Sequence, residues 1–198
     1  MGKRLFDILA SFAGLAITLP LYPFIAVAVK LDSPGPVFFS QSRVGLNGRP
    51  FTILKFRTMV RDAYRQRAIT MKVDRRVTRV GRWLRGLKLD ELPTLWNVLK
   101  GEMSLVGPRP ELQVYVDHYT PEQRQVLSVR PGITDLGTLR FNDEANLLGD
   151  EGQFEDVYLR QILPEKLRLN LEYIARRSFW YDMRIILLTL LLIVRRRN

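Results

Sequence analysis

The 198-residue chain contains no cysteine and a single histidine, His118. Without cysteine the chain can form neither a disulfide framework nor a thiolate metal site. With one histidine it cannot supply a histidine-rich zinc site, and any Ser-His-Asp triad would depend on His118 alone. Acidic residues are few beside basic ones: 20 Asp and Glu against 31 Lys and Arg give a formal net charge of +11. This excess predicts an anionic partner, which is nucleic acid, an acidic membrane surface or a phosphorylated substrate.

A long N-terminal segment, residues 5–29, is apolar and contains one charged residue, Asp7. A helix needs about 20 apolar residues to span a bilayer, so this segment is long enough. It is too long for the core of a cleaved signal peptide, which has about 7–15 residues.

Two prolines interrupt this segment. Pro20 and Pro23 predict a kink, because proline removes a backbone hydrogen bond and clashes with the preceding turn. Basic residues flank both ends of the segment: Lys3, Arg4, Lys30 and Arg43. Since Lys and Arg mark the cytoplasmic side of a membrane, these flanks suit two ends on one side. The residues leave two alternatives open, a spanning helix and a hairpin that enters and leaves by the same face.

A second apolar run covers residues 183–194 and has arginine clusters on both sides. It is too short to span a bilayer. We consider two interpretations. The run is either a helix at the membrane interface, with its arginines toward the headgroups, or a terminal core helix of the globular body.

The middle of the chain predicts one β-hairpin. Two β-prone runs, residues 37–39 and 51–54, flank an Asn47-Gly48 turn signal. Lys55 and Arg57 follow the second run, and strand alternation places both on one face. That face is either a solvated strand surface or a cationic wall that binds phosphates.

An adjacent acid pair, Asp90-Glu91, lies inside a strongly basic stretch. Pro93 sits where a helix should start, and Gly101 should end that helix. Backbone N–H groups and the dipole at a helix start favour negative charge there. The pair has basic neighbours in the sequence or in the expected fold: Lys55, Arg82, Arg85, Lys88 and Arg109. We expect this positive charge to lower both carboxylate pKa values and keep both acids ionised.

Other segments lack this combination of features. The acid pairs Asp143-Glu144 and Asp150-Glu151 have no proline-marked helix start and no dense basic neighbours, so we interpret them as solvated loop charges.

Two stiff loops, residues 107–110 (Gly-Pro-Arg-Pro) and 130–134 (Arg-Pro-Gly-Ile-Thr), hold their arginines with little backbone freedom. Residues 164–174 carry apolar side chains at helical spacing and predict a core helix.

Taken in order, several motifs resemble the bacterial sugar transferases of the monotopic phosphoglycosyl transferase family, over nearly the whole chain. They are Lys30-Leu-Asp-Ser-Pro-Gly-Pro36, Arg43-Val-Gly45, Lys55-Phe-Arg-Thr-Met59, Leu89-Asp-Glu-Leu-Pro93, residues 97–110, residues 130–134 and Ser178-Phe-Trp-Tyr-Asp182. Each motif alone is weak, but their order and spacing are specific.

The resemblance implies a fold and a location. We expect a mainly α protein with a small β-hairpin (α+β), monotopic in the membrane. Residues 1–30 would form a membrane-embedded re-entrant helix broken at Pro20. Residues 31–198 would form a catalytic domain with amphipathic helices at the interface, on the cytoplasmic face of the bacterial inner membrane. The oligomeric state stays open, with a homodimer among the alternatives.

The resemblance also implies an activity. The family transfers a sugar phosphate from a UDP-sugar to a polyprenyl phosphate, such as undecaprenyl phosphate, and releases UMP. Asp90 would be the nucleophile and form a covalent phosphosugar intermediate, and Glu91, with Asp90, would hold Mg²⁺. The expected phosphate-binding residues are Lys55, Arg57, Arg85 and Arg109. Membrane lipids are expected partners and nucleic acid is not. The reaction would be the first membrane step in making exopolysaccharide, O-antigen, capsule or glycoprotein.

Two positions depart from the family pattern. Leu19-Pro20 stands where members often have Ser-Pro, and Asp135 stands where glycine is usual. Asp135 leaves the identity of the donor sugar open.

Two other classes of function compete with the transferase. A basic, membrane-anchored protein that binds nucleic acid or lipid would explain the charge and the apolar ends. It would explain neither the acid pair nor the Gly-Pro-Arg-Pro loop, and it predicts aromatic residues among the basic ones. A Mg²⁺-dependent nucleotide-sugar phosphohydrolase would use the same site but direct water to the phosphorus.

Overall fold

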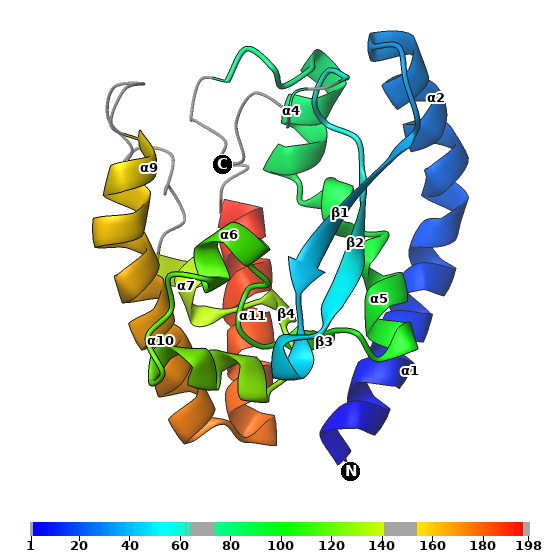
Figure 1. Ribbon diagram of the computed structural model, residues 1–198. Coiled ribbons are helices and arrows are strands. Elements are labelled where there is room, and N and C mark those ends of the chain that lie inside the picture. The colour runs from blue at the N-terminus through cyan, green and yellow to red at the C-terminus, as the bar shows by residue number, and fades with distance from the viewer. Residues whose placement is uncertain (1, 62, 64–73, 141–153, 196–198) are drawn as a thin grey trace.

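The computed structural model describes residues 2–61, 63, 74–140 and 154–195. Most of this chain is helical, with two small two-stranded sheets (Figure 1). The mixed α+β expectation is confirmed, and the prediction of a single hairpin is corrected by the second sheet. Asp143-Glu144 and Asp150-Glu151 lie outside the described residues.

The described chain begins and ends with helices, and all four strands lie between α2 and α7. The helices are α1 (Gly2–Thr18), α2 (Tyr22–Asp32), α4 (Arg79–Gly86), α5 (Thr94–Lys100), α6 (Gln113–Val116), α7 (Leu136–Arg140), α9 (Phe154–Val157), α10 (Leu163–Arg176) and α11 (Phe179–Arg195). Short 3-10 turns are η1 (Leu19–Leu21), η2 (Leu46–Gly48), η3 (Leu89–Glu91) and η4 (Gln123–Ser128), and a π-helical turn, η5 (Tyr158–Ile162), joins α9 to α10. The strands are β1 (Phe38–Val44), β2 (Pro50–Phe56), β3 (Ser104–Val106) and β4 (Gly132–Thr134).

The N-terminal apolar segment is helical throughout. By length and composition, Gly2–Asp32 could cross a membrane. Pro20 lies inside the 3-10 turn between α1 and α2, so the predicted break appears as a change of helix type. Pro23 falls in the first turn of α2, where its missing N–H has no intrahelical partner to lose. α2 continues from α1 toward the far end of the molecule (Figure 1), and the re-entrant arrangement stays a prediction.

Charged residues near the start of α1 bind the body of the protein. Lys3 Nζ lies 2.5 Å from the carboxylate of Asp182, which is buried in α11. Arg4 donates to backbone carbonyls at the end of α5. The buried Asp7 carboxylate accepts from Ser104 Oγ of β3 at 2.8 Å. These contacts fix the first two turns of α1 against the body that carries the acid pair.

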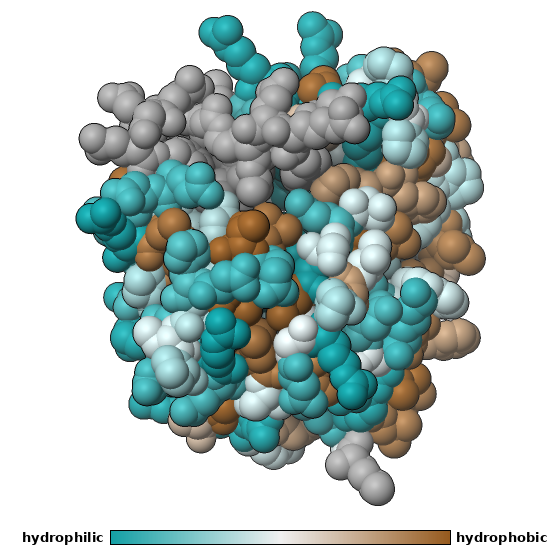
Figure 2. Space-filling model, viewed as in Figure 1, coloured by the Kyte–Doolittle hydropathy of each residue, from teal (hydrophilic) through white to brown (hydrophobic). Residues whose placement is uncertain are grey.

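Apolar side chains gather on the outer side of the N-terminal segment. Phe12 and Phe24 are 66% and 75% exposed, and Leu31 is 83% exposed. Figure 2 shows this hydrophobic edge along α1 and α2. In α11, Ile185 is buried while Leu190 is exposed, so that helix has one core face and one apolar outer face. The buried face agrees with a core helix, and the membrane-interface interpretation stays a prediction for the outer face.

The predicted hairpin is present. β1 and β2 pair antiparallel, with Gln41 opposite Ile53. The turn between them holds Asn47 and Gly48 at φ values of 55° and 75°, the left-handed region that this dipeptide favours. Asn97 of α5 ties the helix to β2, since its Nδ2 donates to Thr52 O at 2.7 Å. The hairpin and α5 therefore form one unit.

A second, parallel sheet was not predicted. β3 and β4 pair over Ser104 to Val106 and Gly132 to Thr134. We expected a stiff loop over residues 130–134, which contain β4. Strands of three residues are too short to show a period of two, so sequence pattern does not reveal them.

The main core lies under α10. The predicted helix at residues 164–174 is confirmed within α10, and its Leu167 is 2% exposed. The buried residues of this core come from β1, α6, the loop after α6, η4, η5 and α10: Val44, Tyr115, Val116, Tyr119, Val126, Tyr158, Ile162, Leu163 and Leu167. This core packs against the segment after β3, and that segment carries Arg109 to the acid pair.

Candidate functional site

The acid pair lies in the 3-10 turn η3, directly before α5. Pro93 caps α5, and Gly101 ends it with φ of 86°, as predicted. Lys88 precedes the turn with φ of 58°, and its carbonyl accepts from Glu91 N at 3.3 Å. Asp90 and Glu91 therefore stand just ahead of the helix start, held by a turn of fixed shape.

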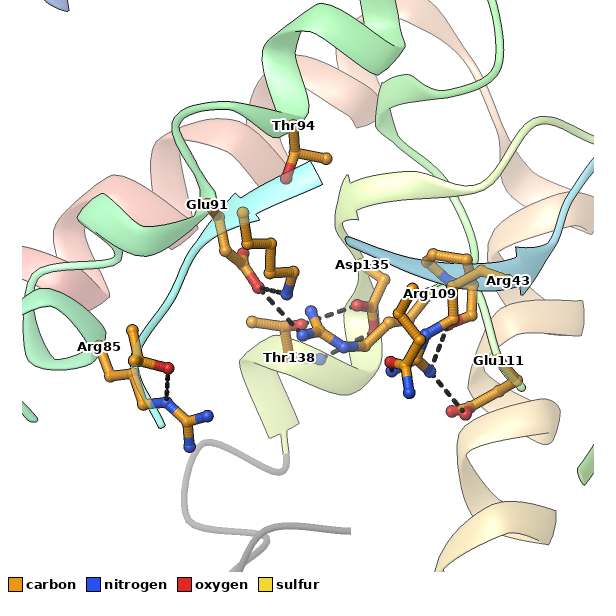
Figure 3. A network of polar contacts seen from close by, with 12 residues as sticks. Arg43, Arg85, Glu91, Thr94, Arg109, Glu111, Asp135 and Thr138 are labelled. Carbon is orange, nitrogen blue, oxygen red and sulfur yellow. Dashed lines mark hydrogen bonds and ion pairs between the residues drawn. The ribbon is translucent and has the colours of Figure 1, made fainter. Parts of the chain in front are cut away.

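Glu91 binds two cations. Its Oε1 accepts from Lys55 Nζ of β2 at 2.5 Å and from Arg109 of the segment after β3 at 3.1 Å (Figure 3). Burial alone would raise the pKa of Glu91, but Lys55 and Arg109 outweigh it and hold that pKa well below its usual range. The structure thus brings together two of the predicted phosphate-binding residues at one carboxylate.

Asp90 differs from its neighbour. It is 8% exposed, and among the described residues no group hydrogen-bonds to its Oδ1. Burial and the adjacent charge of Glu91 raise the pKa of Asp90, although Lys55, Arg85 and Lys88 partly offset them. The expectation that both pKa values are lowered is therefore wrong for Asp90, because desolvation exceeds the effect of its basic neighbours.

Arg109 sits among acidic groups. Glu91 raises its pKa further, with smaller contributions from Asp135 and Glu111, so the guanidinium stays charged. Asp135, which stands where the family usually has glycine, is 4% exposed and caps α7. Its carboxylate accepts from Thr138 N at 2.8 Å and from Thr138 Oγ1 at 2.7 Å. Asp135 thus places a fixed negative charge near Arg109.

Arg43 is a site residue that the sequence analysis did not select. It lines one small open pocket with Lys55, Glu91 and Arg109. Its guanidinium donates to Pro110 O at 3.2 Å and lies 3.7 Å from the carboxylate of Glu111 (Figure 3). The Arg43-Val-Gly motif was the available signal, but sequence alone did not place it beside the acid pair.

Arg85 lies on the other side of Glu91 from Arg109 (Figure 3). Its Nε donates to Thr58 Oγ1 at 2.8 Å, and its charge lowers the pKa of Asp90. The predicted Arg85 is therefore near the acid pair.

Arg57 is placed elsewhere. It is 6% exposed and donates to Val29 O at 3.2 Å, to Ser33 O at 2.7 Å and to Pro34 O. β2 ends at Phe56, so the alternation that grouped Arg57 with Lys55 does not extend to it. We therefore withdraw Arg57 from the phosphate-binding set, because its guanidinium binds the backbone at the end of α2.

The carboxylates of the acid pair are donors of the kind that the predicted magnesium ion takes. Among the described residues no three of His, Cys, Asp and Glu gather as a protein cage for a metal. Mg²⁺ in phosphoryl-transfer sites is commonly bound by one or two carboxylates and the substrate phosphates. Asp90 and Glu91 supply two adjacent carboxylates, and the unpartnered Asp90 Oδ1 is a buried acceptor of the type that such an ion requires.

Comparison with known proteins gives consistent matches. A family model described as bacterial sugar transferase matches residues 1–196. The UDP-glucose:undecaprenyl-phosphate glucose-1-phosphate transferase of Caulobacter vibrioides is 42% identical over 96% of this chain and 68% of its own length. The undecaprenyl-phosphate glucose phosphotransferase of Komagataeibacter xylinus is 42% identical, over 96% of this chain and 35% of its own.

A relative named for another sugar also matches. The UDP-N-acetylgalactosamine-undecaprenyl-phosphate N-acetylgalactosaminephosphotransferase of Aeromonas hydrophila is 39% identical over 95% of this chain and 42% of its own length. The chain therefore spans between 35% and 68% of the length of these relatives.

Proposed function

The chain belongs to the bacterial sugar transferase family, and from this we propose that it transfers a sugar 1-phosphate from a UDP-sugar to undecaprenyl phosphate and releases UMP. The names of the relatives support this reaction class. The observation that carries the proposal is the unequal acid pair: Asp90 is buried and has one oxygen to which no described residue hydrogen-bonds, while Glu91 binds two cations.

Asp90 would act as the nucleophile. Its carboxylate oxygen attacks the phosphorus that bears the sugar, a new carboxyl–phosphorus bond forms, and the bond to the bridging diphosphate oxygen breaks. That oxygen leaves with its electron pair as part of UMP. A phosphate oxygen of the polyprenyl phosphate then attacks the same phosphorus and releases the Asp90 carboxylate. The raised pKa of Asp90 suits this role, because a more basic carboxylate is the stronger nucleophile once it is ionised.

The other charged groups would stabilise the transferred phosphoryl group. Lys55 and Arg109 are held by Glu91 within one pocket, so they are oriented before substrate arrives. Arg85 adds positive charge on the Asp90 side. A Mg²⁺ ion bound by Asp90 and Glu91 would neutralise diphosphate charge.

The same proposal includes a membrane location. The acceptor is a lipid, and Gly2–Asp32 and the outer face of α11 present apolar surface to a bilayer. We place the catalytic body on the cytoplasmic face of the inner membrane, where a nucleotide sugar is available.

The test is UMP release by purified protein with Mg²⁺, a panel of UDP-sugars and undecaprenyl phosphate. We expect release that requires the lipid and yields a lipid-linked sugar. Asp90→Asn should lower the rate by about 1,000-fold or more, since it removes the nucleophile. Asp117→Asn, at an exposed aspartate of the same charge, should leave the rate unchanged.

Covalent trapping provides a second readout. Donor carrying a radiolabelled sugar, added without lipid, should label the wild-type protein and leave Asp90→Asn unlabelled. Hydrolysis of the nucleotide sugar without lipid would instead indicate a phosphohydrolase. Absence of turnover with every donor, together with salt-sensitive polyanion binding, would indicate a binding protein.

A further inference from the structure

The residue before the 3-10 turn that holds the acid pair has an unusual backbone conformation. Lys88 has φ of 58° and ψ of 18°, and Asn47 is the other described non-glycine residue with positive φ. Asparagine adopts this left-handed region readily in turns, whereas lysine does so rarely. The conformation is fixed on both sides, because Lys88 N donates to Arg85 O and Lys88 O accepts from Glu91 N. A glycine or asparagine would make the same turn with less strain, so the turn alone does not account for a lysine here.

The ammonium group of Lys88 differs from the other cations of the site. Lys55 and Arg109 bind Glu91, and Arg85 donates to Thr58. Lys88 is near enough to affect both acids electrostatically, yet no described residue is its hydrogen-bond or ion-pair partner. It is half-buried at the edge of the turn. Its three N–H donors are therefore available to an anion that approaches Asp90.

We propose that Lys88 is a phosphate-binding residue of this site, and that its ammonium group donates to a phosphate oxygen of a substrate. This inference rests on the proposed function. Two substrates offer the same chemistry, the diphosphate of the nucleotide sugar and the monophosphate of the lipid acceptor. The rigid turn holds Lys88 two residues from the nucleophile, so its charge approaches the reacting phosphorus without further ordering of the backbone.

The experiment separates the charge of Lys88 from its backbone conformation. Lys88→Asn and Lys88→Gly both accept a left-handed backbone and remove the charge. Lys88→Arg keeps the charge. Lys100→Asn, at a partly exposed lysine near the end of α5, is the control for loss of one positive charge elsewhere. Each variant is assayed for kcat and for the KM of UDP-sugar and of undecaprenyl phosphate, and its thermal unfolding is recorded.

We expect Lys88→Asn and Lys88→Gly to raise the KM of one substrate by about 10-fold or more, the loss typical of a charged hydrogen bond. Both should unfold at or above the wild-type temperature, and Lys88→Arg should restore most of the affinity. The substrate whose KM rises identifies which phosphate Lys88 contacts. Unchanged KM values for both substrates, or equal losses in Lys88→Arg and Lys88→Asn, would overturn the proposal.

Equilibrium binding distinguishes this outcome from a failure of the proposed function. Calorimetric titration of each variant with UDP-glucose and Mg²⁺, and with undecaprenyl phosphate in micelles, requires no turnover. If wild type binds a phosphate ligand without turnover, and Lys88→Asn binds it more weakly, the transferase proposal fails while Lys88 keeps its role. If both bind equally, the role of Lys88 is refuted whatever the reaction.

Discussion

Two neighbouring carboxylates have opposite electrostatic environments in this protein. Glu91 receives Lys55 and Arg109, while Asp90 keeps an oxygen without a described partner. The first arrangement stabilises a permanent anion that orients cations, and the second preserves a basic carboxylate. The two acids differ because Lys55 and Arg109 hydrogen-bond to Glu91, whereas no described residue hydrogen-bonds to Oδ1 of Asp90. In our proposal Glu91 orients the cations and Asp90 attacks the phosphorus.

Arg85 should control the pH dependence of the reaction. Asp90 must be ionised to attack, so the rate falls as pH drops through its pKa. Arg85 lowers that pKa, and its loss would leave the pKa higher. In Arg85→Gln we therefore expect the acid limb of kcat/KM to move to higher pH.

Rate profiles of wild type and Arg85→Gln check this shift. Arg124→Gln, at an exposed arginine of η4, serves as the control and should leave the limb in place. An acid limb at the same pH in wild type and Arg85→Gln, even with a lower rate, would contradict the electrostatic role.

At the level of secondary-structure elements, β3 and β4 pack closely against each other beside the segment that carries Arg109. Gly107 and Gly132 pack backbone against backbone, and Gly107 comes two residues before Arg109. A Cβ added at Gly132 would lie 2.1 Å from Gly107 N, a clash that only backbone movement can relieve. This close approach explains glycine at both positions.

Gly132→Ala should therefore impair catalysis and stability together. We expect a destabilisation of about 1–3 kcal/mol from the forced backbone shift, and a fall in kcat as Arg109 leaves Glu91. Gly86→Ala at the end of α4 is the matched control, since a Cβ there meets nothing within 4 Å. Thermal unfolding and UMP release measure both effects. Equal behaviour of the two variants would show that the strand contact does not position Arg109.

Sequence pattern predicted the elements that have strong local signals. Asn47-Gly48 located the hairpin, and Pro93 and Gly101 bounded α5. The second sheet was not predicted, because its strands are short and pair although they are far apart in the sequence. Four of the five expected basic neighbours, Lys55, Arg85, Lys88 and Arg109, act on the acid pair, whereas Arg82 donates to Val77 O. The sequence does not reveal how deeply a carboxylate is buried. The prediction that Arg57 binds phosphate failed for a similar reason. The charge of an arginine does not reveal whether it binds a ligand or the backbone carbonyls at the end of a helix.

At the scale of the whole protein, both ends of the N-terminal segment contact the same globular unit. Near its start Lys3, Arg4 and Asp7 bind α11, α5 and β3, and at its end Arg57 binds the carbonyls that follow α2. A helix that crossed the bilayer once would place its two ends on opposite sides of the membrane. In the re-entrant arrangement, which stays a prediction, both ends lie on the side of the catalytic body.

Thiol labelling tests this topology directly, because the chain has no cysteine of its own. Gly2→Cys and Ser40→Cys should both react with a membrane-impermeant reagent from the cytoplasmic face only. Inside-out and right-side-out vesicles supply the two sides, and each variant is its own control. Labelling of the two positions from opposite faces would rule out the re-entrant arrangement.

The buried guanidinium of Arg57 has a consequence for how lipid affects the enzyme. It joins the carbonyls at the end of α2 to the chain two residues after Lys55. Membrane helices shift or tilt when bilayer thickness changes. In the membrane-bound transferase that we propose, a shift of α2 would act through Arg57 on the chain after β2, the strand that presents Lys55 to Glu91. We therefore predict that the acyl-chain length of the membrane affects the geometry of the site around Glu91.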